Sequence, residues 1–334
     1  MEKIEPRPVA PSDSITRVGA IDLLRALTMV LMIFVNDLWS LKDIPVWLEH
    51  VPRGVDGMGL ADVVFPAFLF IVGMSLPFAI DSRRAKGDSD LLLVGHVLGR
   101  SIALLVMGVF FVNGETLNAG ATGMTALVWD TVCSVAFILI WNAYPRIMPQ
   151  WSQRGLKGLG VLILLTLAFI YRGGEDGHLE RFAPHWWGIL GLIGWSYLVA
   201  ALVTIFAHGR LIILTGTWAA FSLLSVAWAA KVVPTRLHII PEPIIDGTMT
   251  ALTLGGVVIA RLFQIFQAKN ENWRMTLVFA AIATLLIALS LYTRQFWGLS
   301  KLAATPAWLF LCSAFTLIAF TGLYWISDMA RKAH

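Results

Sequence analysis

Long apolar runs separated by short polar segments make up most of this chain. A helix needs roughly 20 apolar residues to cross a hydrocarbon layer about 30 Å thick. Runs of about this length predict membrane-spanning helices at 19–38, 61–80, 91–112, 124–143, 157–171, 187–207, 210–230, 246–266, 275–292 and 305–327. We therefore expect an all-α polytopic membrane protein, a bundle of about ten transmembrane helices.

The spacing of the runs predicts how the chain is organised. The run at 157–171 is the shortest, so we expect a short fifth span there. Residues 207–210 leave room only for a tight turn, which predicts an antiparallel hairpin of the sixth and seventh spans. No internal repeat is evident, so residues 17–334 are interpreted as a single transmembrane domain that follows a polar N-terminal tail, residues 1–16.

Composition and charge agree with this pattern. Hydrophobic residues make up 57% of the chain and charged residues 14%, whereas a soluble domain carries about 25% charged residues. Most lysines and arginines outside the spans fall on one side if the N-terminus is cytoplasmic, and an even number of spans then places both termini in the cytoplasm. The net charge of +4 fits such basic loops, and no nucleic-acid partner is expected.

Two cysteines, Cys133 and Cys312, both lie within apolar runs. Free cysteines in such surroundings are usually packed thiols, so neither a disulfide nor a metal pair is expected. No other segment shows metal-ligand spacing, and the sequence predicts no metal.

A polar connector between the first two spans is the natural place for chemistry. Within residues 35–73 lie Asn36, Asp37, His50, Arg53, Asp56 and Asp62. An imidazole can move a proton near neutral pH or act as a nucleophile, so we interpret His50 as the reactive centre. Any of the three aspartates could orient its ring, and Asn36 could stabilise an oxyanion. The alternative is that His50 is an ordinary solvated histidine in a loop.

Charged residues within the spans point to a second site. Asp22 and Arg25 share one face of the first span, and Arg100 lies at a similar depth in the third span. Charges inside a membrane are costly and are usually paired or functional. Two guanidinium groups at one depth suit an anion such as phosphate or pyrophosphate. Alternatively, Asp22 and Arg25 only form a structural pair, and Arg100 reaches to the interface.

Several motifs together resemble the heparan-α-glucosaminide N-acetyltransferase family of transmembrane acyltransferases, including its bacterial members. The motifs cover nearly the whole chain. They are Arg17-x4-Asp22-x2-Arg25, Met32 to Asn36, His50, Ala61 to Gly73, Gly99-Arg100-Ser101, Gly188 to Gly191 with Tyr197-Leu198, Ala304 to Trp308, and Tyr324 to Asp328.

This resemblance implies an enzyme that moves an acetyl group from cytosolic acetyl-CoA to an acceptor across the membrane. The family's catalytic histidine maps onto His50 and its nearby asparagine onto Asn36, while Asp62 would orient the histidine or hold the acceptor. Arg25, Arg100 and Asp22 would bind the CoA. The chain departs from the family pattern after His50, where Val-Pro-Arg-Gly replaces the usual Ser-Trp-Asn-Gly context, and at Leu192, where the family has an arginine.

The acceptor implied is an amino sugar or glycan on the extracytoplasmic side of a bacterial inner membrane. Direct transfer and an acetyl-histidine intermediate both remain open, as does a homodimer. Two other functions are compatible with this pattern of spans and intramembrane charges. One is O-acetylation of surface glycans, although enzymes of that kind carry a histidine where this chain has Asn36. The other is transport of glycan precursors, although the paired helix interruptions typical of transporters are not evident.

Overall fold

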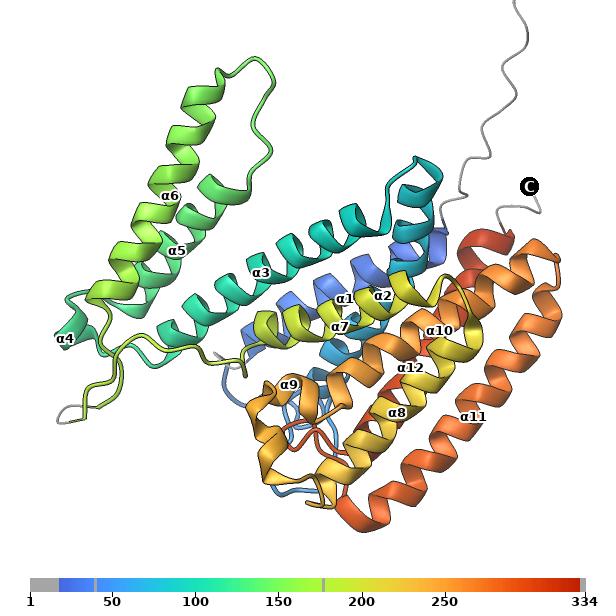
Figure 1. The fold of residues 1–334 in the computed structure, drawn as a ribbon. Helices are drawn as coiled ribbons and strands as arrows, with labels where there is room; N and C mark the ends of the chain where they lie inside the picture. The colour runs from blue at the N-terminus through green and yellow to red at the C-terminus, as the bar shows by residue number, and fades with distance from the viewer. Residues whose placement is uncertain (1–17, 39–40, 176–177, 331–334) are drawn as a thin grey trace, which may run out of the picture.

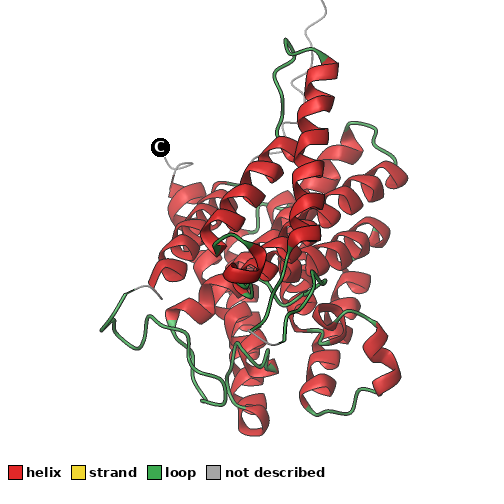
Figure 2. Cartoon of the chain, turned by 90° about the vertical axis from the view of Figure 1, so that its left-hand side faces the viewer, coloured by secondary structure: helices red, strands yellow, loops and turns green. Residues whose placement is uncertain are grey.

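A computed structural model describes residues 18–38, 41–175 and 178–330 of the chain, so the N-terminal tail at 1–16 and Arg17 lie outside the described part. The described chain is built from helices, with two isolated β-bridges near Gly173 (Figures 1 and 2). The helices are α1 (Gly19–Asp37), α2 (Leu60–Ala85), α3 (Asp90–Glu115), α4 (Ala119–Thr122), α5 (Ala126–Trp141), α6 (Gln150–Ile170), α7 (Ile189–Ala207), α8 (Leu211–Ala229), the 3₁₀ helix η2 (Thr235–Ile239), α9 (Glu242–Ile245), α10 (Thr248–Ala268), α11 (Asn272–Trp297), α12 (Pro306–Tyr324) and the π-helical turn η3 (Trp325–Met329).

The predicted architecture is confirmed, and the protein is an integral membrane protein. Nine helices of the described chain are long and apolar enough to cross a membrane. Each predicted run forms one helix, but the prediction that the fifth span is short is wrong. The fifth, α6, has 21 residues, because its polar first turns continue the helix beyond the apolar run. The shorter apolar helix is the fourth, α5, with 16 residues.

Helices α2 and α10 form the centre of the bundle, and glycines let them approach closely (Figure 1). A Cβ added at Gly73 would lie 1.8 Å from the carbonyl oxygen of Thr253, and one at Gly256 would lie 1.9 Å from that of Phe70. Small residues at such crossings allow backbone contact between membrane helices. The apolar stretch that ends at Gly73 is therefore a packing surface as well as a span.

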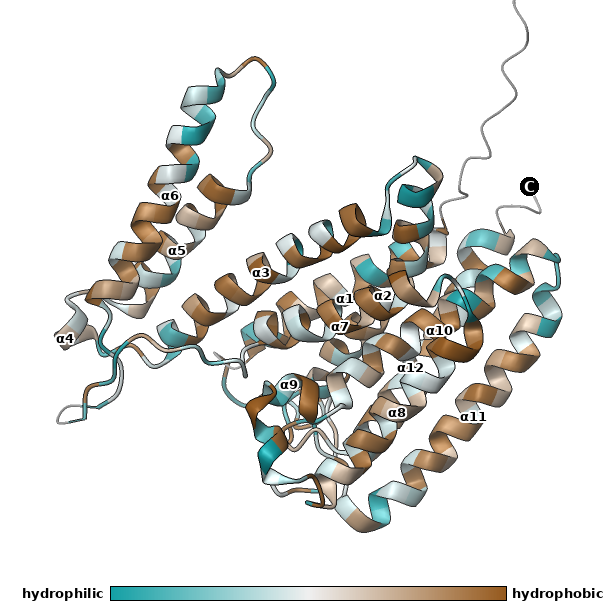
Figure 3. Cartoon of the chain, viewed as in Figure 1, coloured by the Kyte–Doolittle hydropathy of each residue, from teal (hydrophilic) through white to brown (hydrophobic). Residues whose placement is uncertain are grey.

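Helices α5 and α6 form a hairpin that stands apart from the main bundle and contacts it through α3 (Figure 1). Phe110 of α3, Trp129 of α5 and Tyr171 at the end of α6 hold the hairpin in a buried aromatic cluster. The outward surfaces of these helices are mostly hydrophobic, as expected for helices that face lipid (Figure 3). The hairpin formed by α7 and α8 turns tightly at His208 and Gly209, which have φ values of 46° and 73°.

The start of α1 and the end of α12 meet. The Asp328 carboxylate in η3 accepts hydrogen bonds from the backbone N–H groups of Gly19, at 2.8 Å, and Ala20, at 2.7 Å. A carboxylate at this place satisfies free donors at the helix N-terminus and interacts favourably with the helix dipole. The described ends of the chain therefore lie on one side of the bundle, as expected if the shorter apolar helix α5 also crosses the membrane and brings the number of spans to ten.

Candidate active site

The connector between α1 and α2 folds back along the first turn of α2. The backbone N–H groups of Leu60 and Ala61 donate to the carbonyl oxygens of Trp47 and Leu48, at 2.8 and 3.3 Å. Only glycine fits at position 59, because a Cβ there would lie 1.9 Å from the carbonyl oxygen of Glu49. This close contact brings the segment that carries His50 to the N-terminus of α2.

His50 and Asp62 form a hydrogen-bonded pair. Nδ1 of His50 lies 2.7 Å from Oδ1 of Asp62, and Oδ2 accepts hydrogen bonds from the backbone N–H groups of Val51 and Gly59, at 3.0 and 3.1 Å. Asp62 is 1% exposed, whereas the His50 side chain is 43% exposed. A buried carboxylate held by two backbone donors fixes one ring nitrogen of an accessible imidazole, and leaves the other ring nitrogen to react.

The C-terminal part of the chain supports this pair. The indole Nε1 of Trp308 donates a hydrogen bond to the carbonyl oxygen of Asp62 at 2.9 Å. Trp308 lies in the first turn of α12 and is fully buried. The motif at 304–308, singled out in the sequence, therefore contributes to the site by holding the turn of α2 that carries Asp62.

Lys301, in the loop between α11 and α12, was missed as a site residue. Its Nζ lies 3.4 Å from Nδ1 and 3.5 Å from Nε2 of His50, and 6.0 Å from the centre of the Phe65 ring. Burial lowers the pKa of Lys301, although the Asp62 carboxylate partly opposes that shift. The sequence signal was one lysine in a short loop directly before the 304–308 motif.

A cavity of about 800 Å³ opens beside Lys301, and we call it the Lys301 pocket. Aromatic and charged side chains form much of its wall, among them Phe65, Trp186, Trp187, Trp228, Glu242, Asp246 and Lys301. Burial raises the pKa of Asp246 to about 7. Trp186 and Trp187, directly before α7, both line this cavity.

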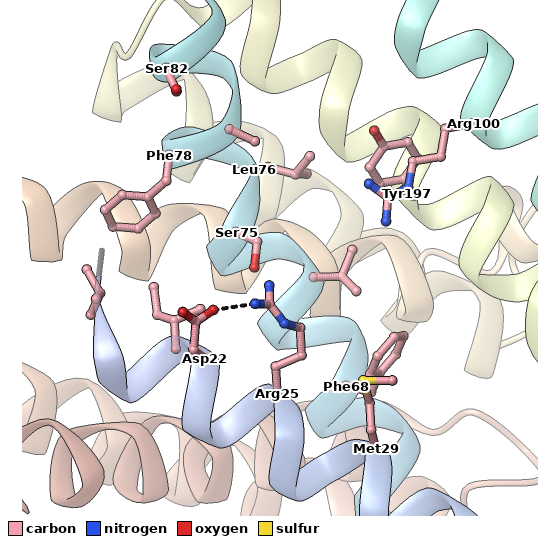
Figure 4. A pocket seen from close by; sticks show the side chains of 14 residues that line it. Asp22, Arg25, Met29, Phe68, Ser75, Leu76, Phe78, Ser82, Arg100 and Tyr197 are labelled. Carbon is pink, nitrogen blue, oxygen red and sulfur yellow. Dashed lines mark hydrogen bonds and ion pairs between the residues drawn. The ribbon is translucent and has the colours of Figure 1, made fainter. Parts of the chain in front are cut away.

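A second cavity, of about 660 Å³, lies between α1, α2, α3 and α7, and we call it the Arg25 pocket (Figure 4). Asp22 and Arg25 of α1 form an ion pair in its wall. Arg100 of α3 enters from the opposite side, with its guanidinium 5.2 Å from the centre of the Tyr197 ring. The structure thus brings all three intramembrane charged residues predicted from the sequence to one cavity, and adds Tyr197.

The two pockets are neighbours along the bundle. On α2 the Lys301 pocket reaches Phe65 and the Arg25 pocket begins at Phe68, which places them about 4.5 Å apart along the helix axis. On α7 they reach Leu192 and Tyr197. Along these two helices the lining residues of the two pockets are therefore separated by roughly 4.5 to 7.5 Å, about one to one and a half helical turns.

The remaining predicted site residues lie apart from the His50 ring. Asn36 is exposed near the end of α1, and in the described part of the chain no hydrogen bond joins it to His50 or Asp62. Asp56 instead binds Arg294, at 3.0 Å, and the backbone N–H of Leu299, at 2.7 Å; the latter bond is the main reason why the pKa of Asp56 is lowered. The role of Asn36 in catalysis stays a prediction.

The cysteines behave as expected: Cys133 and Cys312 are buried free thiols. Between residues 18 and 330, leaving aside the four undescribed positions, no group of three histidine, cysteine or acidic side chains could hold a metal ion. The expectation of a metal-free site stays a prediction.

Comparison with known proteins agrees with the resemblance found in the motifs. No family model matches the chain. Heparan-alpha-glucosaminide N-acetyltransferase of Mus musculus is 35% identical over 130 residues, which are 38% of this chain and 18% of the relative. The protein of the same name from Homo sapiens is 33% identical over 120 residues, 35% of this chain and 16% of the relative. The match spans less than a fifth of the length of these curated relatives, and within it the predicted resemblance to heparan-α-glucosaminide N-acetyltransferase is confirmed.

Proposed function

We propose that this protein is a membrane acetyltransferase. It moves an acetyl group from cytosolic acetyl-CoA to an amino sugar or glycan acceptor on the extracytoplasmic side. The observation that carries the proposal is the His50–Asp62 pair beside one pocket, with an arginine-lined pocket about one helical turn away along α2. The printed names of the two relatives, which describe an N-acetyltransferase acting on a glucosaminide, support the same reaction class.

His50 is the proton-transfer group in this proposal. With Nδ1–H donating to Asp62, Nε2 removes a proton from the acceptor amine or hydroxyl as that group attacks the thioester carbonyl. The tetrahedral intermediate then expels the CoA thiolate, which takes the proton from the imidazolium. In the second version Nε2 itself attacks the thioester carbonyl, the C–S bond breaks and the CoA thiolate leaves. The acceptor then attacks the acetyl carbon, the bond from that carbon to Nε2 breaks, and the freed Nε2 takes the proton of the acceptor.

The Arg25 pocket is the proposed site for CoA. The guanidinium groups of Arg25 and Arg100 converge on it from two helices, an arrangement that suits phosphate oxygens (Figure 4). Asp22 keeps Arg25 oriented through their ion pair. CoA bound there would direct its thioester along α2 toward Phe65 and the His50 side of the bundle.

The Lys301 pocket is the proposed site for the acceptor. The indole faces of Trp186, Trp187 and Trp228 offer flat apolar surfaces of the kind that pack against sugar rings. Glu242 and Asp246 add carboxylates that can accept hydrogen bonds from hydroxyl or ammonium groups. The orientation in the membrane is inferred from the placement of basic residues, which puts both termini in the cytoplasm of a bacterial cell. The proposal also includes a homodimer.

The test is release of free CoA from acetyl-CoA by purified protein in detergent, with and without glucosamine. Variants His50→Ala and His178→Ala are compared, because His178 is an exposed histidine outside both pockets. We expect release that needs both glucosamine and His50, and that His178→Ala leaves unchanged. Release that needs His50 but no acceptor would favour the acetyl-histidine version.

Wild-type CoA release in His50→Ala would overturn both versions of the mechanism. No CoA release from any sugar or glycan acceptor would overturn the acetyltransferase proposal. Transport would then be measured directly, as uptake of labelled amino sugar into vesicles that contain the protein.

A further inference from the structure

Lys301 carries a positive charge that no acidic side chain of the described chain neutralises directly. Its side chain is only partly accessible, and none of the ion pairs between residues 18 and 330 that the structure describes includes it. Among the described residues it contacts the ring of His50, at 3.4 Å from Nδ1 and 3.5 Å from Nε2, too far for a strong hydrogen bond. A partly buried ammonium without a carboxylate partner is costly, and such groups usually serve a ligand.

The loop that carries Lys301 is held from three directions. Both backbone groups of Leu299 bond to the connector: its N–H donates to Oδ1 of Asp56 at 2.7 Å, and its carbonyl oxygen accepts from the N–H of Gly57 at 3.0 Å. Ser300 N–H donates to Thr305 Oγ1 at 3.1 Å at the start of α12. The Thr248 hydroxyl of α10 donates to the carbonyl oxygen of Ala304 at 2.9 Å. The ammonium is therefore carried on a rigid support, as electrostatic catalysis requires.

Lys301 also forms part of the boundary between the reacting ring and the cavity. It lines the Lys301 pocket together with Phe65, whereas His50 is not among the lining residues and its Nδ1 lies 3.4 Å from the Lys301 Nζ. Any acyl carbonyl placed within reach of His50 Nε2 from this pocket must also pass close to the ammonium.

We propose that Lys301 is a further catalytic residue, whose ammonium contacts the acetyl carbonyl oxygen and stabilises the oxyanion of the tetrahedral intermediate. The inference rests on the proposed acetyltransferase function. As the acceptor or His50 forms its bond to the carbonyl carbon, the carbonyl π electrons move to oxygen, and the ammonium hydrogen-bonds that charge. When the C–S bond breaks, the electrons return and the thiolate leaves. Lys301 keeps its proton throughout.

Geometry favours Lys301 over Asn36 for this role. Asn36 has no described hydrogen bond to either member of the pair, whereas Lys301 Nζ lies within 3.5 Å of His50. A charged donor also forms stronger hydrogen bonds to a developing oxyanion than a neutral amide does. Asn36 then remains available for contact with the acceptor or for a structural role at the end of α1.

The test compares Lys301→Gln, which removes the charge at similar length, with Lys301→Arg, which keeps it. Lys42→Gln, an exposed lysine of the connector, is the matched control. We expect kcat for CoA release to fall about 100-fold or more in Lys301→Gln. Lys301→Arg should recover part of this loss, KM for acetyl-CoA should stay unchanged, and the control should match wild type.

The pH profile separates catalysis from support of the fold. Because burial lowers the pKa of Lys301, the ammonium loses its proton at a lower pH than an ordinary lysine, so wild-type kcat should fall on the alkaline side. Arginine keeps its proton there, and Lys301→Arg should extend activity to higher pH. If Lys301 had only a structural role, the Lys301→Arg substitution would leave both the acidic and the alkaline limb of the pH profile of kcat unchanged.

His50→Ala, assayed in parallel, separates the two proposals. Loss of activity in His50→Ala with wild-type kcat in Lys301→Gln would overturn the role of Lys301 alone. Wild-type activity in His50→Ala would overturn the proposed mechanism itself. If Lys301→Gln yields no folded protein, as judged by gel filtration in detergent, the pH profile of Lys301→Arg decides. If the alkaline limb of Lys301→Arg is then identical to that of wild type, the proposed catalytic role of Lys301 is overturned.

Discussion

At the scale of single residues, the two oxygens of Asp62 have different partners. Oδ2 receives the backbone N–H groups of Val51 and Gly59 and so supports the start of α2, whereas Oδ1 meets His50. A carboxylate that only capped the helix would not need the histidine, and one that only served catalysis would not need the backbone donors. Asp62 therefore couples the fold of the connector to the orientation of the imidazole.

Asp62→Asn separates these two tasks. The amide oxygen of asparagine can still accept the two backbone hydrogen bonds, but its NH₂ group then faces His50 Nδ1 and favours the wrong tautomer. We expect kcat for CoA release to fall on the order of 10³-fold or more, as for other histidines that lose an orienting aspartate. The thermal midpoint in detergent should change little.

Asp43→Asn is the control for this prediction, because Asp43 is an exposed aspartate of the same connector. If Asp62→Asn kept the kcat of wild type, the carboxylate would be only a helix cap, and the His50–Asp62 pair would lose its mechanistic meaning.

At the scale of elements, α12 and its π-helical extension hold both ends of the site. Trp308, in its first turn, binds the Asp62 carbonyl oxygen, and Asp328, beyond its last turn, binds the N-terminus of α1. Helix α1 in turn supplies Asp22 and Arg25 to the Arg25 pocket. One helix thus positions the reacting pair at one end and the proposed CoA site at the other.

Asp328→Asn tests the second contact. The amide keeps one acceptor but loses the charge that favours the α1 N-terminus, so the expected loss of stability is about 1 kcal/mol. Small displacement of α1 should weaken CoA binding, and KM for acetyl-CoA should rise more than kcat falls.

The control variant is Glu271→Gln, which removes an exposed ion pair with Arg274 on a surface turn before α11. Such pairs contribute little, so KM should stay at the wild-type value. An unchanged KM in Asp328→Asn as well would show that this contact does not position the Arg25 pocket.

At the scale of the whole molecule, the proposed reaction needs the two pockets to face opposite sides of the membrane. The ends of the described chain meet at Gly19 and Asp328, and the connector with His50 lies at the far end of α1. If the termini are cytoplasmic, as the basic residues indicate, His50 and Lys301 face the extracytoplasmic side.

Thiol labelling tests this sidedness. Both native cysteines are buried, so the background is low. A membrane-impermeant maleimide should label Lys42→Cys in intact cells, because Lys42 is exposed in the connector, and should label Lys86→Cys, exposed after α2, only after permeabilisation. The opposite pattern would invert the orientation and place His50 in the cytoplasm.

The sequence by itself determined the elements. Hydropathy and span length depend on local composition, and they predicted ten helices with most ends within three residues of the observed ones. The exceptions are the ends of α2 and α11, which lie five residues later than predicted, and the start of α6, which lies seven residues earlier. Depth along a helix is also a local quantity, because each residue adds a fixed rise, and so Arg25 and Arg100 could be placed at one level without a structure. The predicted length of α6 was too short because the first turns of this helix are polar. Hydropathy identifies only the apolar part of a helix and not the part that continues beyond the apolar layer.

Only the tertiary structure decided which side chains meet. The sequence offered three aspartates for His50, and the fold of the connector around Gly59 selects Asp62, while Asp56 binds Arg294 and Leu299 instead. Lys301 reaches His50 across a separation of 251 residues. Contacts of this kind depend on how the ends of α2, α10 and α12 pack together. Helix formation and membrane insertion leave a periodic or compositional signal in the sequence, but the packing of helix ends against one another does not.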